Sequence, residues 1–206
     1  MARPNQQTAR RLGLLAAAQR AVAQTGVAKL RLKDVADAAG VTPASVLYYY
    51  GDGIDALLAA LYRQSIARYC ERRREVIGAH DSAHDQLIAS IRHGVPAGAD
   101  DEEAKVIWQM DGFIGSDPLY DVLGTQQFEE QVSVYERVLA AGQDSGDFSL
   151  ATNPRAIARA LVSLEDGLGR QVIGGNPDIG RAEALSIIGV FASLAVGAGI
   201  DPAEAG

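Results

Sequence analysis

The sequence predicts an all-α fold with about nine helices, and three observations support this prediction. Apolar residues recur along most of the chain with the three-and-four spacing of a helical face. The pairs Thr42-Pro43, Asp117-Pro118 and Asn153-Pro154 are typical helix starts, because the polar side chain can accept a backbone N–H and proline suits the first turn. Glycine-rich breaks separate the segments, and no segment shows the alternating pattern of a half-buried strand.

Four helices are expected in the first part of the chain. The first is predicted over residues 8–24 and ends before Gly26. Two short helices are predicted over residues 32–39 and from Thr42 to about Tyr49, with a turn at Gly40 between them. A long helix over residues 54–77 follows the break at residues 51–53. The predicted buried face of the first helix consists of Leu12, Leu15, Ala16, Val22 and Ala23.

Further helices are expected over residues 82–93, 101–114, 118–141, 154–173 and 179–196. The last of them differs from the others because its apolar side chains point in nearly every direction. A helix that is apolar on all sides must be buried on all sides. One side can cover its own subunit, and the other can pack on a second copy across a twofold axis. The sequence therefore predicts a homodimer, and burial within a monomer is the alternative.

The charge is unevenly distributed along the sequence. The 206 residues carry a net charge of −7, yet residues 1–33 contain seven basic and no acidic side chains. The remaining residues contain 12 basic and 26 acidic side chains. A basic N-terminal segment attached to an acidic body can concentrate the attraction for phosphate in one part of the chain.

The composition indicates a folded protein without a membrane span. Hydrophobic residues make up 48% and charged residues 22%, as in ordinary globular domains. The longest apolar stretch, residues 187–200, falls short of the roughly 20 residues that a membrane span needs. The single cysteine, Cys70, cannot form an intramolecular disulfide, which agrees with a reducing compartment. We therefore expect a cytoplasmic protein that has no membrane partner.

The segment Arg31–Tyr50, RLKDVADAAGVTPASVLYYY, has the pattern of two crossed short helices. A close crossing admits only small side chains such as Ala36, and Gly40 can adopt the positive φ of the turn. The predicted buried seam consists of Val35, Ala39, Val41 and Val46. The later of these two helices, which is the third along the chain, then exposes short or aromatic groups suited to a DNA groove. They are Thr42, Ala44, Ser45, Tyr48 and Tyr49. A helical hairpin that does not bind DNA is the alternative, and Tyr50 fits either packing or contact.

This segment resembles the helix-turn-helix of the TetR family of transcriptional regulators. The family pattern IA..AGVS.G.LYYHF is similar to VADAAGVTPASVLYYY, and DALLAALY follows as the start of a long helix, so the resemblance covers roughly residues 10–62. The resemblance implies that the third helix enters the major groove. The residues expected to contact DNA are Arg31, Lys33, Thr42, Pro43, Ala44, Ser45, Tyr48 and Tyr49. Gly51 and Ile54 depart from the family, which often has a phenylalanine and a phosphate-contacting lysine there.

The resemblance also implies two domains and a function. Residues 1–52 would form the helix-turn-helix DNA-binding domain, and residues 53–206 a helical effector-binding and dimerisation domain. The implied function is a ligand-responsive transcriptional regulator, most commonly a repressor. It would bind palindromic operator DNA as a homodimer through its last two helices and be released by a small-molecule effector. The alternative is a helical small-molecule-binding protein or enzyme whose N-terminal hairpin no longer binds DNA.

The resemblance further implies an effector cavity among the middle helices, where the sequence offers aromatic and acidic candidates. The candidate effector-binding residues are Trp108, Asp111, Phe113, Tyr135 and Glu165. A carboxylate beside aromatic rings could bind a cationic ligand, and residues 158–175 resemble the penultimate helix of choline-responsive members. Calorimetry with quaternary amines or polyamines would test this hypothesis.

We expect no catalytic site, no metal and no cofactor. His80 and His84 lie four residues apart, which is compatible with a metal site. Ser82 between them is better interpreted as a helix cap followed by acidic residues in the first turn. No catalytic motif stands out at a recognisable spacing.

Overall fold

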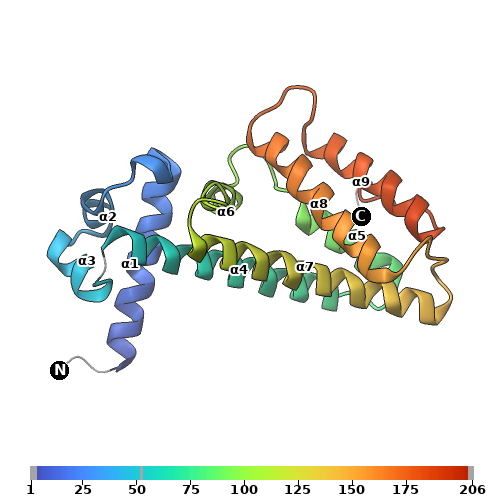
Figure 1. The fold of residues 1–206 in the computed structure, drawn as a ribbon, viewed down its shortest axis with the longest axis horizontal. Coiled ribbons are helices and arrows are strands. Elements are labelled where there is room, and N and C mark those ends of the chain that lie inside the picture. Colours follow the sequence, from blue (N-terminus) through green and yellow to red (C-terminus); the bar gives the residue numbers. More distant parts are fainter. Residues whose placement is uncertain (1–3, 52, 204–206) are drawn as a thin grey trace. The chain divides into compact units, whose positions relative to one another are not determined.

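The structure, a computed structural model, describes residues 4–51 and 53–203, and all of its regular elements in these ranges are helical (Figure 1). The all-α prediction is therefore confirmed. The elements are α1 (Pro4–Thr25), the short 3₁₀ helix η1 (Val27–Lys29), α2 (Leu32–Ala39), α3 (Pro43–Tyr49), α4 (Ile54–Gly78), α5 (Ala83–Gly94), α6 (Glu102–Asp111), α7 (Pro118–Ser145), α8 (Pro154–Ile173) and α9 (Arg181–Val196).

The helices pack into two compact units. The first unit combines residues 1–67 with residues 102–124, and the second combines residues 68–101 with residues 125–206. Helices α4 and α7 therefore contribute residues to both units. This division into two units follows packing. The boundary expected between residues 52 and 53 instead separates the expected DNA-binding domain from the expected effector-binding domain, and it remains a prediction.

In the first unit, α1 packs on α2 and α6 through a face rich in small side chains. Its buried residues are Leu14, Leu15, Ala17, Ala18, Ala21 and Val22. The predicted face was wrong at two positions, because Leu12 is 49% exposed and Ala16 is also exposed. Both possible faces of this alanine-rich helix are apolar, and the packing of α2 and α6 selects between them.

The turn between α2 and α3 has the predicted geometry. Gly40 adopts a left-handed conformation with φ of 66°, and the N–H of Val41 donates to the carbonyl oxygen of Ala36 at 3.0 Å. Thr42 caps α3, since its Oγ1 accepts the backbone N–H of Ser45 at 3.2 Å. Ala36, like Val46, has no exposed surface, as a close crossing requires. The remaining seam residues divide, with Val35 buried and Ala39 and Val41 only half-buried.

In the second unit, α8 packs on α9, and α5 contacts both helices. The apolar core includes Leu87, Leu139, Leu161 and Ile188, all without exposed surface. Ser82 and Asn153 accept backbone N–H groups at the starts of α5 and α8, as their positions in the sequence predict. These caps fix where two of the core helices begin.

Helix α9 buries one apolar face and exposes another. Ala184, Leu185 and Ile188 lie in the core, whereas Val190 is 61% and Leu194 is 76% exposed. Part of the α9 surface thus remains uncovered in the single chain.

Among the described residues, no helix combines the length and the apolar character that a membrane span requires.

Replacing Ala36 with leucine tests the close crossing of α2 and α3. We expect Ala36→Leu to lower the free energy of unfolding by about 1–3 kcal/mol, because a fully packed site has no space for the added carbons. Ala38→Leu is the matched control on the exposed side of the same helix, and its effect should stay within about 0.5 kcal/mol. Urea unfolding followed by circular dichroism measures both; equal effects would contradict the close crossing.

Candidate functional site

Helix α3 presents most of the residues that the sequence predicts to contact DNA. Thr42, Pro43 and Ala44 are exposed at its start, and Ser45 is half-exposed. Tyr48 is 74% exposed. On the opposite side of the helix, Val46 is buried. The structure therefore brings these groups onto one outward surface of the first unit.

The C-terminal end of α3 is fixed by Arg11 of α1. The Nη1 atom of Arg11 donates to the carbonyl oxygen of Tyr49 at 3.1 Å, and the hydroxyl of Tyr50 donates to the carbonyl oxygen of Arg11 at 3.1 Å. The Arg11 guanidinium also lies 4.7 Å from the centre of the Tyr50 ring. Tyr50 is only 3% exposed, so it packs the helix in place. Tyr48 and Tyr49 meet edge to face, with ring centres 5.0 Å apart.

Basic side chains lie around α2, next to this surface in the chain. Arg31 and Lys33 are both exposed, and the backbone N–H of Arg31 donates to Asp34 Oδ2 at 2.8 Å, which fixes the start of α2. Arg20 donates to the carbonyl oxygen of Ala38 at 3.2 Å, near the end of the same helix. Ile54 is half-buried at the first position of α4, where the family often has its lysine.

The second unit contains a buried polar cluster that joins α4, α5, α7 and α8. The Nη2 atom of Arg73 lies 2.9 and 3.0 Å from the two carboxylate oxygens of Glu165 and donates to the carbonyl oxygen of Ser90 at 3.2 Å. Its Nη1 atom donates to Gln131 Oε1 at 2.8 Å. The hydroxyl of Tyr135 donates to Glu165, and the Arg73 guanidinium lies 4.5 Å from the centre of the Tyr135 ring.

Burial dominates the electrostatics of this cluster. It raises the pKa of Glu165 to about 7, although the Arg73 charge and the hydrogen bonds from Tyr135 and Arg73 act in the opposite direction. Burial opposes the charge of Arg73, but the Glu165 carboxylate raises the pKa of the guanidinium above its ordinary value. The pKa of Tyr135 is raised by burial and by Glu165. Arg73 therefore stays protonated, while Glu165 can gain or lose a proton near neutral pH.

Two buried nitrogen atoms at this cluster have no hydrogen-bond partner among the residues that the structure describes. They are Nε of Arg73 and Nδ1 of His93. The His93 ring lies 4.8 Å from the ring of Tyr69, whose hydroxyl accepts from Arg73 Nη1 at 3.5 Å. Burial, together with the charges of Arg73 and Arg72, lowers the pKa of His93 to about 4. A bound group could supply the missing partners, because unsatisfied buried polar atoms are costly.

The five predicted effector residues do not form one cluster. Tyr135 and Glu165 meet in the second unit, as described. Asp111 and Phe113 belong to the first unit, where Asp111 accepts a hydrogen bond from Tyr62 and the Phe113 ring lies 5.1 Å from that of Tyr120. Trp108 is half-buried on α6. Whether these residues bind an effector remains a prediction.

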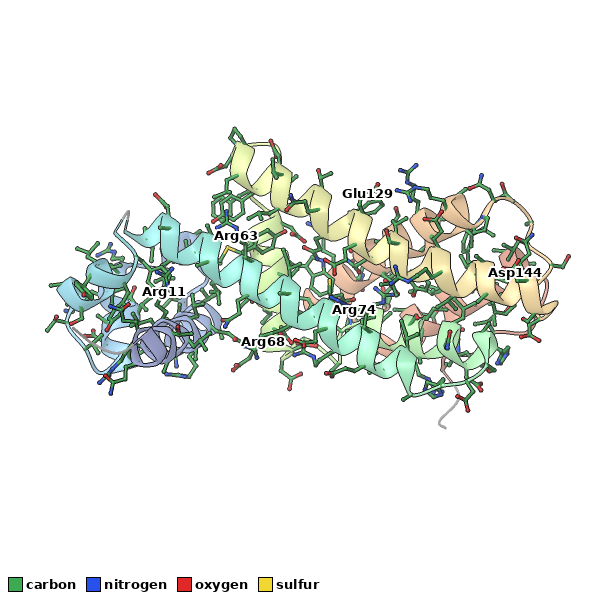
Figure 2. All side chains as sticks on the ribbon, turned by 90° about the horizontal axis from the view of Figure 1, so that it is seen from below. Arg11, Arg63, Arg68, Arg74, Glu129 and Asp144 are labelled. Atoms are coloured by element: carbon green, nitrogen blue, oxygen red, sulfur yellow. The ribbon has the colours of Figure 1, made fainter. Side chains whose placement is uncertain are left out.

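Arg73 is not among the residues predicted from the sequence, where it is the middle one of three consecutive arginines in ERRREV. Its register was the available signal. Arg73 lies seven residues after Ile66, three after Cys70 and four before Ile77, so it shares their apolar helical face. An arginine in that register is buried. Arg74 next to it, which Figure 2 labels, is exposed and pairs with Glu130 at 2.9 Å.

His80 and His84, whose spacing is compatible with a metal site, have separate surroundings. His84 Nε2 lies 2.7 Å from the carbonyl oxygen of Gly199, and His80 is exposed in the loop between α4 and α5. Ser82 between them caps α5, because its Oγ accepts the N–H of Asp85 at 3.0 Å. The capping interpretation is confirmed.

Comparison with known proteins agrees with the helix-turn-helix and with the whole fold. Residues 14–61 match the model of the bacterial regulatory proteins of the tetR family. No curated protein gives a significant match.

Solved structures resemble the chain over nearly its whole length. A regulator from Rhodococcus sp. assigned to the TetR family is 24% identical, with a TM-score of 0.77 over 90% of this chain and 98% of its own. A transcriptional regulator from Saccharomonospora viridis, solved in complex with choline, is 20% identical, with a TM-score of 0.83 over 92% and 98%. A TetR transcription regulator from Haloarcula marismortui is 20% identical, with a TM-score of 0.79 over 91% and 97%.

These structures share the fold of the chain at low identity, and the family model matches the segment that contains its crossed helices. The helix-turn-helix, the outward surface of α3 and the helical body agree with the same assignment. Residues 14–61 therefore match the tetR family of bacterial regulatory proteins, and the whole chain shares the helical fold of the compared structures.

Proposed function

We propose that the protein is a ligand-responsive transcriptional regulator that binds palindromic operator DNA as a homodimer. The observation that carries the proposal is the outward surface of α3, which lies within the matched TetR domain and exposes Thr42, Ala44 and Tyr48. In a helix-turn-helix, such a surface enters the major groove and contacts base edges and phosphates. Repression, the commoner behaviour in the family, is the proposed direction of control, and the cytoplasm is the proposed location.

In this proposal, basic side chains near α2 attract the phosphates of the DNA. Arg31 and Lys33 are exposed, and among the described residues neither is in an ion pair. Ile54 cannot supply the contact that a lysine makes at that position in other family members. We therefore assign the compensating attraction to Arg31 and Lys33.

The proposed dimer interface is formed by α8 and α9. The uncovered side of α9 carries Ile187, Val190, Phe191 and Leu194, which follow the i, i+3, i+4, i+7 spacing of one helical face. An apolar stripe of this kind is covered when a second copy packs the same face against it.

The effector is proposed to bind at the buried polar cluster of the second unit. Support comes from the partnerless Nε of Arg73 and Nδ1 of His93, and from the Saccharomonospora viridis regulator, which was solved with choline. Arg73 already supplies the positive charge beside Glu165 and Tyr135. A cationic effector would have to displace that guanidinium, so the cationic-ligand hypothesis remains a prediction. If the effector binds one state of the dimer more tightly, the binding of effector and the binding of DNA change each other's affinity by the same factor.

Salt-dependent binding to the upstream region of the protein's own coding sequence tests the DNA-binding function. We expect retention of a palindromic fragment in a gel-shift assay. Removal of one phosphate contact by Arg31→Gln or Lys33→Gln should weaken binding and reduce the slope of log affinity against log salt by about 1. Arg137→Gln, an exposed arginine on α7, is the control and should leave the slope unchanged. Failure to bind any genomic fragment at low salt would favour a ligand-binding protein or enzyme that has lost DNA affinity.

A charge on the uncovered face of α9 should separate the dimer. We expect Val190→Glu to shift the protein to the monomer in sedimentation at micromolar concentration, because an unpaired carboxylate would be buried in the interface. Val122→Glu is the matched control on α7, since Val122 is 54% and Val190 is 61% exposed. A dimer that survives Val190→Glu would place the interface elsewhere.

The raised pKa of Glu165 predicts how stability changes with pH. The folded protein holds this proton up to about pH 7, whereas the unfolded chain releases it near the ordinary value of 4.5. The folded state therefore binds more protons between these values, and stability should fall as pH rises from about 4.5 to about 7. We expect the wild type to lose about 1–3 kcal/mol relative to Glu165→Gln between pH 5 and pH 8 in urea unfolding. His93 has the opposite effect on stability at lower pH, but it is present in both proteins and therefore cancels in the comparison. Parallel curves of stability against pH for the wild type and Glu165→Gln would contradict the raised pKa of Glu165.

A further inference from the structure

A cavity of about 620 Å³ lies wholly within the first unit. Its walls come from α1, the end of α3, the first half of α4 and the segment around the start of α7. This volume falls within the range of roughly 300–1,000 Å³ that is typical of small-molecule sites. None of its residues belongs to the polar cluster of the second unit, so the cavity is a separate feature.

The floor of the cavity is apolar and aromatic. Tyr50, Leu58 and Tyr120 line it and are each less than 10% exposed. The Tyr120 ring lies 5.1 Å from that of Phe113, which also lines the cavity. Ala60 adds a small side chain from α4, and a larger residue there would occupy the space. A flat ring of a ligand could lie against this aromatic wall.

The rim of the cavity carries two positive and two negative side chains. Arg63 and Asp55 are exposed on α4 and have no hydrogen-bond or ion-pair partner among the described residues (Figure 2 shows Arg63). Asp117 caps α7 through the N–H of Leu119 at 2.9 Å, and Arg11 donates to the Tyr49 carbonyl. The groups of opposite sign that are available to a ligand are therefore Arg63 and Asp55.

Three of these four side chains act electrostatically on the Tyr120 hydroxyl. Burial raises the pKa of Tyr120, the carboxylates of Asp117 and Asp55 raise it further, and Arg63 lowers it. The acidic and basic groups of the rim therefore act on one point of the aromatic floor. A ligand with a ring on that floor would bring its own charged groups near both.

We propose that this cavity binds a small zwitterion with an aromatic body, the chemical class of the aromatic amino acids. The ring lies on Phe113 and Tyr120, the ligand carboxylate faces Arg63, and its ammonium group faces Asp55. Tyr49 forms part of the same wall and ends the recognition helix. A ligand in the cavity would therefore contact α3, the helix that we propose reads DNA. This contact would be independent of an effector in the second unit.

Isothermal titration of the full chain with L-tryptophan tests the proposal. We expect one site per chain. Arg63→Gln should weaken binding about tenfold or more, because it removes a charge-assisted hydrogen bond, and Ala60→Leu should weaken it by filling the cavity. The matched controls are Arg137→Gln for the exposed arginine and Ala67→Leu for an exposed alanine on α4, and both should bind as the wild type does. Thermal melts verify that each variant is folded.

Two analogues separate the charges of the ligand. Indole-3-propionate lacks the ammonium group and tryptamine lacks the carboxylate, so each should bind at least about tenfold more weakly than L-tryptophan. Asp55→Asn should reduce the preference for L-tryptophan over indole-3-propionate. Absence of heat with L-tryptophan, or equal affinities of the wild type, Arg63→Gln and Ala60→Leu, would overturn the proposal. Because no DNA is present in the titration, either result leaves the proposed regulator function unaffected.

Discussion

The outward surface of α3, which we propose reads DNA, depends on the close crossing of α2 and α3. Ala36 and Val46 have no exposed surface, so the two helices meet without space for a larger side chain. Gly40 turns the chain at φ of 66°, a conformation that costs little only for glycine. Thr42 then starts α3 with its own cap. The exposure of Tyr48 follows from these three conditions, since the buried side of a two-turn helix determines its exposed side.

The buried cluster around Arg73 obeys a different constraint. Removing two charges from water costs several kcal/mol per ion, and a buried pair recovers this only with good geometry and further hydrogen bonds. Arg73 meets Glu165 with two short contacts and also bonds to Gln131 and Ser90. Apolar side chains would hold four helices together at lower cost. The two unsatisfied nitrogen atoms in this cluster are the reason that we propose it as the effector site.

Local chemistry determined which parts of the structure could be predicted. The bounds of α2 and α8 and the caps at Thr42, Ser82 and Asn153 follow from neighbouring residues, and the structure confirms them. The buried face of α1 was predicted wrongly at Leu12, because the choice between two apolar faces depends on distant helices. Helix α6 ends at Asp111 rather than at residue 114, since residues 113–117 form turn hydrogen bonds. Burial of Arg73 required knowledge of its partners on α5, α7 and α8.

The two candidate ligand sites differ in what a ligand would gain. In the second unit, the charges of Arg73 and Glu165 already have partners, so a ligand gains mainly the unsatisfied nitrogen atoms and must compete with internal contacts. In the first unit, Asp55 and Arg63 are solvated, and a ligand replaces water rather than protein groups. Each rim contact of this kind accounts for about a tenfold difference in affinity. Affinity there must come largely from the ring on the buried floor, and the charges decide which ring-bearing ligand is accepted.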